Sequence, residues 1–359
     1  MKKEPQSKLR IKDIAELAQV SPGTVDRVLH NRGEVKEDTR LKILNIINDH
    51  SYTPNIIAKS LASKRNRVIA VLIPEATEDN PYWNNPLIGI NQTAIEISDF
   101  STQVETYTFN PAEENSFIDT ANEILKSVPD GVVFNPAFNE ASLAFSKNME
   151  QLNIPFVFID INLKNCKNLA YFGQDALKSG CVAAKLMAHC MPENATILIA
   201  QLAQKKNVTE HMLQRENGFR NFFIKNEKPV NIISAEIDLL RITEPESSID
   251  EIFDRHPEIK GIFVPNSRVF KVAEYLENSQ ISQKLVIGYD LIGDNVRFLK
   301  SGTVDFLLGQ KPEEQGRKSI EAVFNFIMTK KRIEKINYSP IDIILKENFE
   351  YYLRKENNE

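Results

Sequence analysis

The first fifty residues carry apolar positions at helical spacing in three short stretches, which predict three helices. Val20-Ser21-Pro22 separates the first two stretches. Ser21 can cap the second helix because its hydroxyl accepts from a first-turn amide, and Pro22 suits the first helical position, which needs no amide donor. Two short helices at a tight turn, closed by a third, predict a helix-turn-helix unit. The apolar positions are Ile11, Ile14, Ala15, Leu17 and Ala18; Val25, Val28 and Leu29; and Leu41, Ile43, Leu44, Ile46 and Ile47.

From Val68 onward the pattern changes to short, continuous apolar runs separated by amphipathic segments of helix length. This alternation predicts parallel sheets covered by helices on both faces, a doubly wound α/β fold. At about 290 residues this body exceeds a single core, so we expect two subdomains. The predicted strands are Val68–Ile73, Gly131–Phe134, Pro155–Ile159, Thr196–Ala200, Gly261–Val264, Leu285–Ile287 and Phe306–Leu308.

Between these parts lies the apolar stretch Ile56–Ala62, followed by the basic run Lys64-Arg65-Asn66-Arg67. It predicts a short helix that needs a partner to pack on, because a helix of this length has little stability of its own. We therefore expect a helix-turn-helix domain at 1–54, a hinge helix and linker at 55–67, a two-lobed domain at 68–350 and a tail at 351–359.

The charge distribution separates the two parts further. The 359-residue chain has a net charge of −5, but residues 1–65 carry 13 Lys/Arg against 8 Asp/Glu, whereas the rest carries 31 against 41. A basic head on an acidic body suggests that only the head meets a polyanion such as nucleic acid. No apolar run approaches the length of a membrane span, and Met1–Arg10 lacks a signal core, so we expect a cytoplasmic protein.

Motifs of catalysis and metal binding are absent from the sequence. Neither G-x-G-x-x-G nor a Walker loop nor a G-x-S-x-G elbow occurs, and the five histidines show no metal-binding spacing. Three cysteines without C-x-x-C spacing favour free thiols. We therefore expect no cofactor, no metal site and no enzymatic activity.

The head resembles the LacI/GalR family of ligand-responsive transcription regulators. The stretch from Ile11 to Asn31 matches the opening helices of the family, Thr39-Arg40 and Tyr52-x-Pro54-Asn55 match its next signatures, and an α/β body follows in order. The resemblance implies a type I periplasmic-binding-protein-like effector domain with two subdomains behind the helix-turn-helix and hinge helix.

The resemblance also implies which residues meet DNA. Pro22, Gly23 and Arg27 take base-facing positions at the start of the second helix, and Arg27 can donate two hydrogen bonds to guanine. Asp26 departs from the serine usual in the family, and a carboxylate near phosphate is repulsive unless it pairs with a donor. Leu61 matches the minor-groove wedge of the hinge helix, although it can also simply pack on the body. The expected DNA-binding set is Ser21, Pro22, Gly23, Thr24, Asp26, Arg27, His30, Asn31, Asn55, Ala58 and Leu61.

In the body, polar side chains directly follow predicted strands, and the carboxyl edges of parallel strands are where ligands bind in open α/β sheets. The resemblance implies that Asp160, Asn266, Asp290 and Gln310, which follow such strands, take ligand-contacting positions, and that Arg215 is the ligand-binding arginine of the family. Each strand-end residue taken alone is equally explained as a helix cap. Carboxylates, amides and one arginine suit a polyol such as a sugar, and aromatics can stack on its apolar face. A phosphorylated ligand is less favoured, although Lys205 and Lys206 keep it open. The expected effector-binding set is Tyr82, Trp83, Asp160, Arg215, Asn266, Asp290 and Gln310.

The sequence thus predicts a homodimeric repressor that binds a near-palindromic operator and a small carbohydrate-like effector. Dimerisation is expected because a single helix-turn-helix contacts few bases. Residues 347–359 lack a heptad run, which argues against a tetramerising coiled coil. Two alternatives are a sugar-binding module of transport type, which has no use for the head, and an α/β sugar-processing enzyme, which needs a nucleotide loop or a matched catalytic pair.

Overall fold

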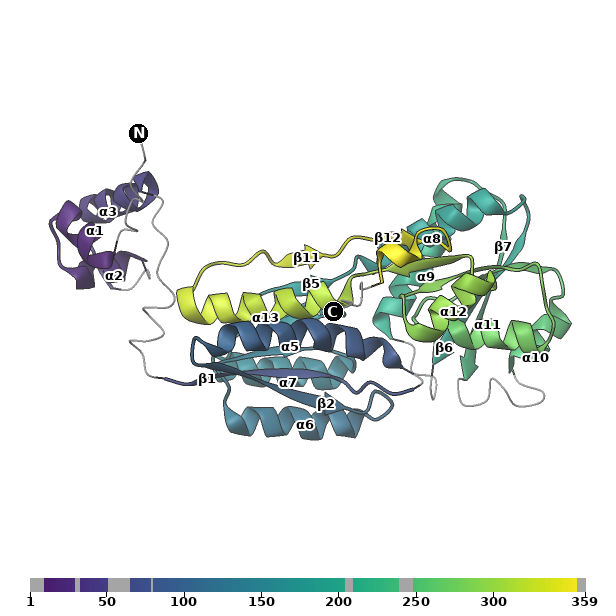
Figure 1. The fold of residues 1–359 in the computed structure, drawn as a ribbon, viewed down its shortest axis with the longest axis horizontal. Coiled ribbons are helices and arrows are strands. Elements are labelled where there is room, and N and C mark those ends of the chain that lie inside the picture. The colour runs from purple at the N-terminus through teal and green to yellow at the C-terminus, as the bar shows by residue number, and fades with distance from the viewer. Residues whose placement is uncertain are drawn as a thin grey trace, which may run out of the picture.

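The computed structural model describes residues 10–29, 33–50, 65–78, 80–203, 209–238 and 248–353. Three helices come first, α1 (Ile11–Ala18), α2 (Pro22–Leu29) and α3 (Glu37–Asp49). Two α/β lobes follow, each built on one sheet (Figure 1). This confirms the predicted fold class, a helix-turn-helix followed by a doubly wound α/β body.

The three N-terminal helices share one small core. It is formed by Ile14, Ala15 and Ala18 of α1, by Val25 and Val28 of α2, and by Ile43 of α3. The hydroxyl oxygen of Ser21 accepts from the amide of Thr24 at 3.2 Å, so Ser21 caps α2 as predicted.

Three apolar positions of the predicted core are exposed instead. Leu17 and Leu41 are each 51% exposed and Leu44 is 38% exposed. The apolar residues of α3 spread over more than one face, and only the face with Ile43 meets the other two helices. Periodicity alone did not identify that face.

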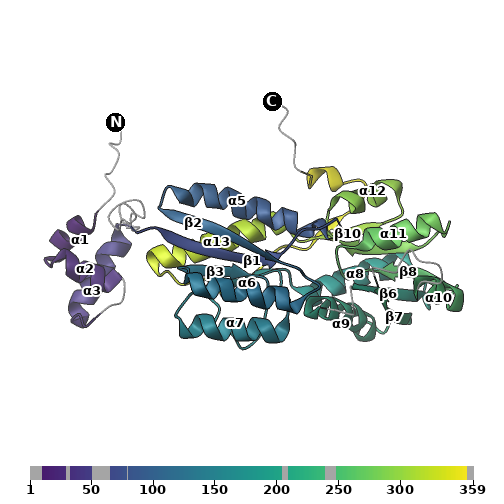
Figure 2. The ribbon, with the colours of Figure 1, turned by 90° about the horizontal axis from the view of Figure 1, so that it is seen from below.

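The first lobe has a parallel six-stranded sheet in the order β11-β5-β4-β3-β1-β2. Helices α5 and α13 cover one face, and α6 and α7 cover the other (Figure 2). The strands are β1 (Arg67–Pro74), β2 (Thr102–Phe109), β3 (Gly131–Phe134), β4 (Phe156–Ile159), β5 (Tyr171–Gly173) and β11 (Ile336–Tyr338). The helices are η1 (Pro81–Trp83), α5 (Asn84–Ser98), α6 (Glu114–Ser127), α7 (Asn139–Gln151) and α13 (Pro312–Thr329).

The second lobe repeats this plan with the order β12-β10-β9-β8-β6-β7. All its pairings are parallel except that of β12, which runs antiparallel to β10. The strands are β6 (Thr196–Ala203), β7 (Asn231–Asp238), β8 (Ile259–Phe263), β9 (Leu285–Tyr289), β10 (Phe306–Gly309) and β12 (Asp342–Ile344). The helices are α8 (Ala176–Cys190), α9 (Glu210–Lys225), α10 (Ser248–Arg255), α11 (Val269–Asn278), α12 (Gly293–Ser301) and η2 (Phe349–Tyr351).

Strand β1 shows why the strands read as continuous apolar runs. Ile69, Val71 and Ile73 pack in the cluster with α5 and α13, whereas Ala70 and Leu72 pack in the cluster with α6 and α7. Because both faces are covered, successive residues are all buried. Every predicted strand is present, but β2, β5, β7, β11 and β12 were not predicted.

The chain crosses between the lobes after β5, after β10 and after β11, and Gln174 ties these three segments together. Its side-chain nitrogen donates to the carbonyl oxygen of Gly309 at 3.0 Å and to that of Pro340 at 3.4 Å. The amide of Ser339 also donates to the carbonyl oxygen of Gly173 at 2.7 Å. Hydrogen bonds therefore join the three crossover segments that form the hinge between the lobes. A change in the relative position of these segments would alter the bonds.

Candidate functional site

The ends of the strands bring polar side chains from both lobes to one cavity. Asp160 follows β4 of the first lobe, and Asn266, Asp290 and Gln310 come after β8, β9 and β10 of the second. The cavity volume is about 120 Å³, below the roughly 300 to 1,000 Å³ typical of clefts for drug-sized ligands, so a small ligand fits best. The structure brings all the residues expected to bind effector to this cavity: Tyr82, Trp83, Asp160, Arg215, Asn266, Asp290 and Gln310.

Two aspartates face the cavity from opposite lobes, and both have a left-handed backbone, with φ of 66° at Asp160 and 68° at Asp290. Aspartate tolerates this conformation better than most residues. The Asp160 carboxylate accepts from the Tyr82 hydroxyl at 3.2 Å and from the Asn135 amide nitrogen at 3.3 Å. The Asp290 carboxylate accepts from the Gln310 amide nitrogen at 3.0 Å. Each carboxylate is therefore held in place by its own neighbours.

Burial shifts the protonation of both aspartates. It raises the pKa of Asp160 to about 6, against the opposing charge of Arg215 and the hydrogen bonds from Tyr82 and Asn135. Burial likewise raises the pKa of Asp290 to about 7, again opposed first by Arg215. A carboxyl group that titrates near neutrality can accept from a hydroxyl when ionised and donate to one when protonated.

Arg215 of α9 lies at the centre of the site and is only 3% exposed. Its guanidinium stacks on the Tyr289 ring at 3.7 Å from the centroid, donates to the carbonyl oxygen of Pro265 at 2.9 Å and donates to the side-chain oxygen of Gln310 at 3.4 Å. Its Nε is buried without a hydrogen-bond partner in the described structure. A buried donor of this kind is costly unless a ligand or water completes it.

Asn266 lines the same cavity, but its amide mainly serves the local backbone. Its nitrogen donates to the carbonyl oxygen of Leu202 at 2.7 Å, and its oxygen accepts from the amide of Arg268 at 3.0 Å. The second bond is an Asx turn, the capping role that the sequence left open for strand-end residues.

The two aromatic residues pack edge to face, with ring centroids 5.3 Å apart. Both are buried at 5% exposure, and the hydroxyl of Tyr82 is bonded to Asp160. Tyr82 therefore orients a carboxylate as well as supplying apolar surface to the cavity.

Sequence reasoning missed several polar residues of the lining. Asn135 directly follows β3 and could have been found by the strand-end signal that selected Asp160. Thr209 and His211 at the start of α9, and Arg268 before α11, lie in segments whose approach to the cavity depends on how the elements pack.

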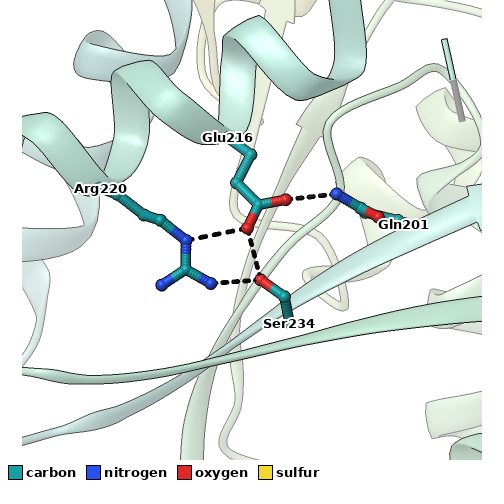
Figure 3. Close-up of polar contacts among 4 residues, drawn as sticks. All are labelled: Gln201, Glu216, Arg220 and Ser234. Carbon is teal, nitrogen blue, oxygen red and sulfur yellow. Dashed lines mark hydrogen bonds and ion pairs between the residues drawn. The ribbon is translucent and has the colours of Figure 1, made fainter. Parts of the chain in front are cut away.

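Next to Arg215, a polar network fixes α9 to the sheet (Figure 3). Glu216 accepts from Arg220 at 2.8 Å, from the Ser234 hydroxyl at 2.6 Å and from the side-chain amide of Gln201. Glu216 is 9% exposed, and a carboxylate this buried needs such partners. The network connects α9 to β6 and β7 and so holds the helix that carries Arg215.

The packing of α8 against α9 also fixes the position of Arg215. A Cβ atom at Gly180 of α8 would overlap the carbonyl oxygen of Arg215, and one at Gly218 of α9 would overlap that of Leu177. The two helices thus meet through glycines, and only glycine allows this approach.

In the head, the start of α2 presents an exposed face. Ser21, Pro22, Gly23 and Arg27 are exposed, whereas Thr24 and Asp26 are half-buried. The guanidinium of Arg27 donates to the Thr24 hydroxyl at 3.2 Å, so its side chain lies along the outer surface of the helix. The predicted positions His30, Asn31, Asn55, Ala58 and Leu61, the whole predicted hinge helix, and Lys205 and Lys206 lie outside the described residues.

Within the described ranges, no group of three or more His, Cys, Asp or Glu side chains is arranged to hold a metal ion. Cys166, Cys181 and Cys190 are free thiols, as expected. None of the helices in this part of the chain is both long and apolar enough to cross a membrane.

Comparison with known proteins places both parts of the chain. Residues 69–331 match the periplasmic binding protein domain, and residues 10–55 match the bacterial regulatory proteins of the lacI family. The ribose operon repressor of Halalkalibacterium halodurans is 27% identical over 288 residues, which cover 78% of this chain and 80% of the repressor. The transcriptional regulator MalR of Streptococcus pneumoniae is 23% identical over 337 residues, or 91% of this chain and 95% of MalR.

A crystal structure assigned to the LacI transcriptional regulators, from Bacteroides fragilis, is 32% identical with a TM-score of 0.75, covering 80% of this chain and 100% of that one. Fold and cavity together define a two-lobed periplasmic-binding-protein domain that follows a helix-turn-helix head. The chain belongs to the LacI family of bacterial transcription regulators. It is a DNA-binding regulator, and the family resemblance read from the sequence is confirmed.

Proposed function

We propose that this regulator is a repressor that binds a near-palindromic operator as a homodimer and a small carbohydrate-like effector in the cavity between its lobes. The observation that carries the proposal is the convergence of two carboxylates, side-chain amides and one buried arginine from both lobes on a small cavity, in a chain with a helix-turn-helix head. Because its partner is the chromosome, the regulator acts in the cytoplasm.

The lining suits a polyol because each sugar hydroxyl both donates and accepts. Asp160 and Asp290 accept, whereas Arg215 supplies donors, and an unpaired buried polar group costs about 1 to 3 kcal/mol. The name of the ribose operon repressor agrees with an effector of this class. In this proposal the effector is bound and released unchanged.

The exposed start of α2 is proposed to enter the major groove. There Arg27 reads guanine, while Pro22 and Gly23 allow close approach without side-chain hydrogen bonds. Ser21, Thr24 and Asp26 border this surface, and His30, Asn31 and Asn55 are proposed to complete it. Two heads are needed because one helix reads too few bases, so half-sites are expected about one helical turn apart. Ala58 and Leu61 are proposed to contact the minor groove at the operator centre.

The test is a selection of random double-stranded DNA by the full chain, followed by mobility-shift titration of the selected sequence. We expect two half-sites related by symmetry, and Arg27→Ala should relax the preference at a guanine by about 1 to 3 kcal/mol, while the exposed body variant Arg255→Ala should not. In parallel, a thermal-shift screen of neutral sugars and sugar acids should find a ligand that raises the unfolding midpoint. Retention of DNA without any sequence preference would contradict the proposal.

A further inference from the structure

One wall of the cavity contains a second arginine and a histidine that the polyol proposal does not use. Besides Arg215, it contains Thr209, His211 and Arg268, all from the second lobe. Asp160 lies across from them on the first lobe, and Asp290 follows β9 on the second. The second lobe therefore contributes both arginines of the lining and one of its two carboxylates.

His211 lies in this wall beside Thr209. Its Nδ1 lies 3.1 Å from the Thr209 hydroxyl oxygen, which orients the ring. Burial lowers its pKa well below 6.5, and the charges of Arg215 and Arg268 lower that pKa further. Both guanidinium groups are thus close enough to repel a proton on His211, and the three side chains form one cluster.

The backbone adds to this potential. Thr209 is the N-cap residue of α9 and Arg268 is that of α11, and in neither case does the side chain cap the helix. The 16-residue helix α9 therefore begins at this wall, whereas in the first turn of α11 the amide of Phe270 already donates to the side-chain oxygen of Asn295 at 3.0 Å. Helix N-termini favour anions through their amide groups and dipole.

Arg215 also carries a buried hydrogen-bond donor without an acceptor in the described part of the chain. Arg215 is 3% exposed, and its Nε has no partner among the described residues. The carboxylates do not supply one, because Asp160 is bonded to Tyr82 and Asn135 and Asp290 to Gln310. Burial also favours their neutral form by raising the pKa values to about 6 and about 7, which lessens their repulsion of an anionic ligand.

We propose that the effector is a sugar acid, whose carboxylate accepts from the Nε of Arg215 and lies against His211, Thr209 and Arg268 while its hydroxyl groups meet Asp160 and Asp290. The inference rests on the proposed carbohydrate effector and names its class. Guanidinium groups bind both carboxylates and phosphates, and a carboxylate is preferred because it is the smaller anion and the cavity volume is only about 120 Å³. His211 and Arg268 are then the residues that determine specificity.

The experiment is calorimetric titration of the full chain with matched pairs, D-glucuronate against D-glucose and D-galacturonate against D-galactose, with D-glucose 6-phosphate as a third arm. One uronate should bind at least about tenfold more tightly than its neutral partner, as expected for a charge-assisted hydrogen bond. His211→Phe keeps a ring and Arg268→Met keeps the aliphatic part of the side chain, and each should remove most of this preference by lowering the affinity for the uronate far more than the affinity for the neutral sugar. The matched control Arg255→Met changes an exposed arginine paired with Glu251 and should bind as wild type.

The outcomes separate the inference from the function it builds on. If a neutral sugar binds as tightly as its acid, or if the two variants keep the preference, the sugar-acid inference is overturned and a carbohydrate effector stands. Preference for D-glucose 6-phosphate over both uronates overturns the choice of a carboxylate. If none of the five compounds binds, the inference fails, and a thermal-shift response to any other sugar decides whether the carbohydrate effector fails with it.

Discussion

At the scale of single residues, Arg215 organises the site. It contacts Gln310, Tyr289 and the carbonyl oxygen of Pro265, and its charge acts on both aspartates. Removing it would leave buried carboxyl groups without their main counter-charge, a loss that is expensive at a buried site.

Arg215→Ala should therefore weaken effector binding by about 1 to 3 kcal/mol or more, because ligand groups and aspartates both lose a partner. Arg215→Lys keeps the positive charge but lacks the paired donors of the planar guanidinium, and it should recover part of the affinity. Operator binding without effector should stay near the wild-type value. Calorimetric titration with the best ligand of the screen measures the effect, and unchanged affinity in Arg215→Ala would remove this residue from the site.

The raised pKa of Asp290 gives a second prediction at this scale. It moves from 3.8 to about 7 in the folded protein, so between these values the folded state holds the proton more tightly than the unfolded chain. Stability from this group is therefore lost as the pH rises from about 4 to about 7. Asp290→Asn cannot ionise and should gain stability relative to wild type over that window. Urea unfolding at pH 5 and pH 8 measures the difference, and a difference independent of pH would contradict the assignment.

Much of the residue-scale site could be predicted from the sequence because polar residues follow apolar strands in a recognisable order. Asp160, Asn266, Asp290 and Gln310 were found in this way. The engagement of Asn266 with the backbone was not predictable in detail, and neither was the approach of His211 and Arg268. These positions depend on how α9 and α11 pack on the sheet, which is determined by contacts between residues distant in the chain.

At the scale of elements, the crossing of α8 and α9 positions the site. The helices meet at Gly180 and Gly218, and the Glu216 network fixes α9 to β6 and β7. A side chain at the crossing has to push the two helices apart and so displace Arg215.

Gly180→Ala should lower the free energy of unfolding by about 1 to 3 kcal/mol, the usual cost of overpacking, and weaken effector binding as well. Gly293→Ala is the matched control, because Gly293 begins α12 and nothing lies within 4 Å of the added Cβ position. The control should be neutral or slightly stabilising. Chemical unfolding of both variants is the measurement, and equal stabilities would show that the helices are not in close contact.

Prediction from the sequence succeeded for the longer buried strands and failed for edge strands and for strands of three residues. The central strands are apolar throughout, whereas β2 and β7 lie at sheet edges and mix exposed with buried positions, so their pattern was weaker. Strands β5, β11 and β12 have three residues each and are defined by their pairing. In α3, Leu41 and Leu44 were assigned to the core because the partner face could not be identified from one helix.

At the scale of the whole molecule, hydrogen bonds of Gln310 connect the cavity to the hinge between the lobes. Gln310 bonds Asp290 and Arg215 through its side chain, and its carbonyl oxygen accepts from Gln315 of α13 at 2.7 Å. It thus stands in the second crossover, beside the segments joined by Gln174. A ligand that bonds to these residues is expected to bias the arrangement of the lobes, and the difference in its affinity for the two arrangements sets the size of the bias.

Gln174→Ala should loosen the hinge, because the hydrogen bonds to Gly309 and Pro340 are lost together. Its effector affinity should fall by about 1 to 3 kcal/mol, although Gln174 is not part of the cavity lining. Titration of the variant with the screened ligand measures this change. Wild-type affinity would show that these bonds do not stabilise the ligand-binding arrangement.

The charge division between head and body and the order of the α/β elements made the two-part organisation predictable. The strand orders and the three crossovers were not, because they arise from pairing between distant segments such as β11 and β5.

The central claim is that the cavity controls the affinity of the head for DNA. The most direct measurement is a pair of operator titrations of the full chain, with and without a saturating concentration of the ligand found by the screen. We predict that operator affinity changes by roughly 5- to 150-fold, that it falls if the ligand is an inducer and rises if it is a corepressor, and that the operator changes ligand affinity by the same factor. Equal operator affinities with and without a tightly bound ligand would contradict the account.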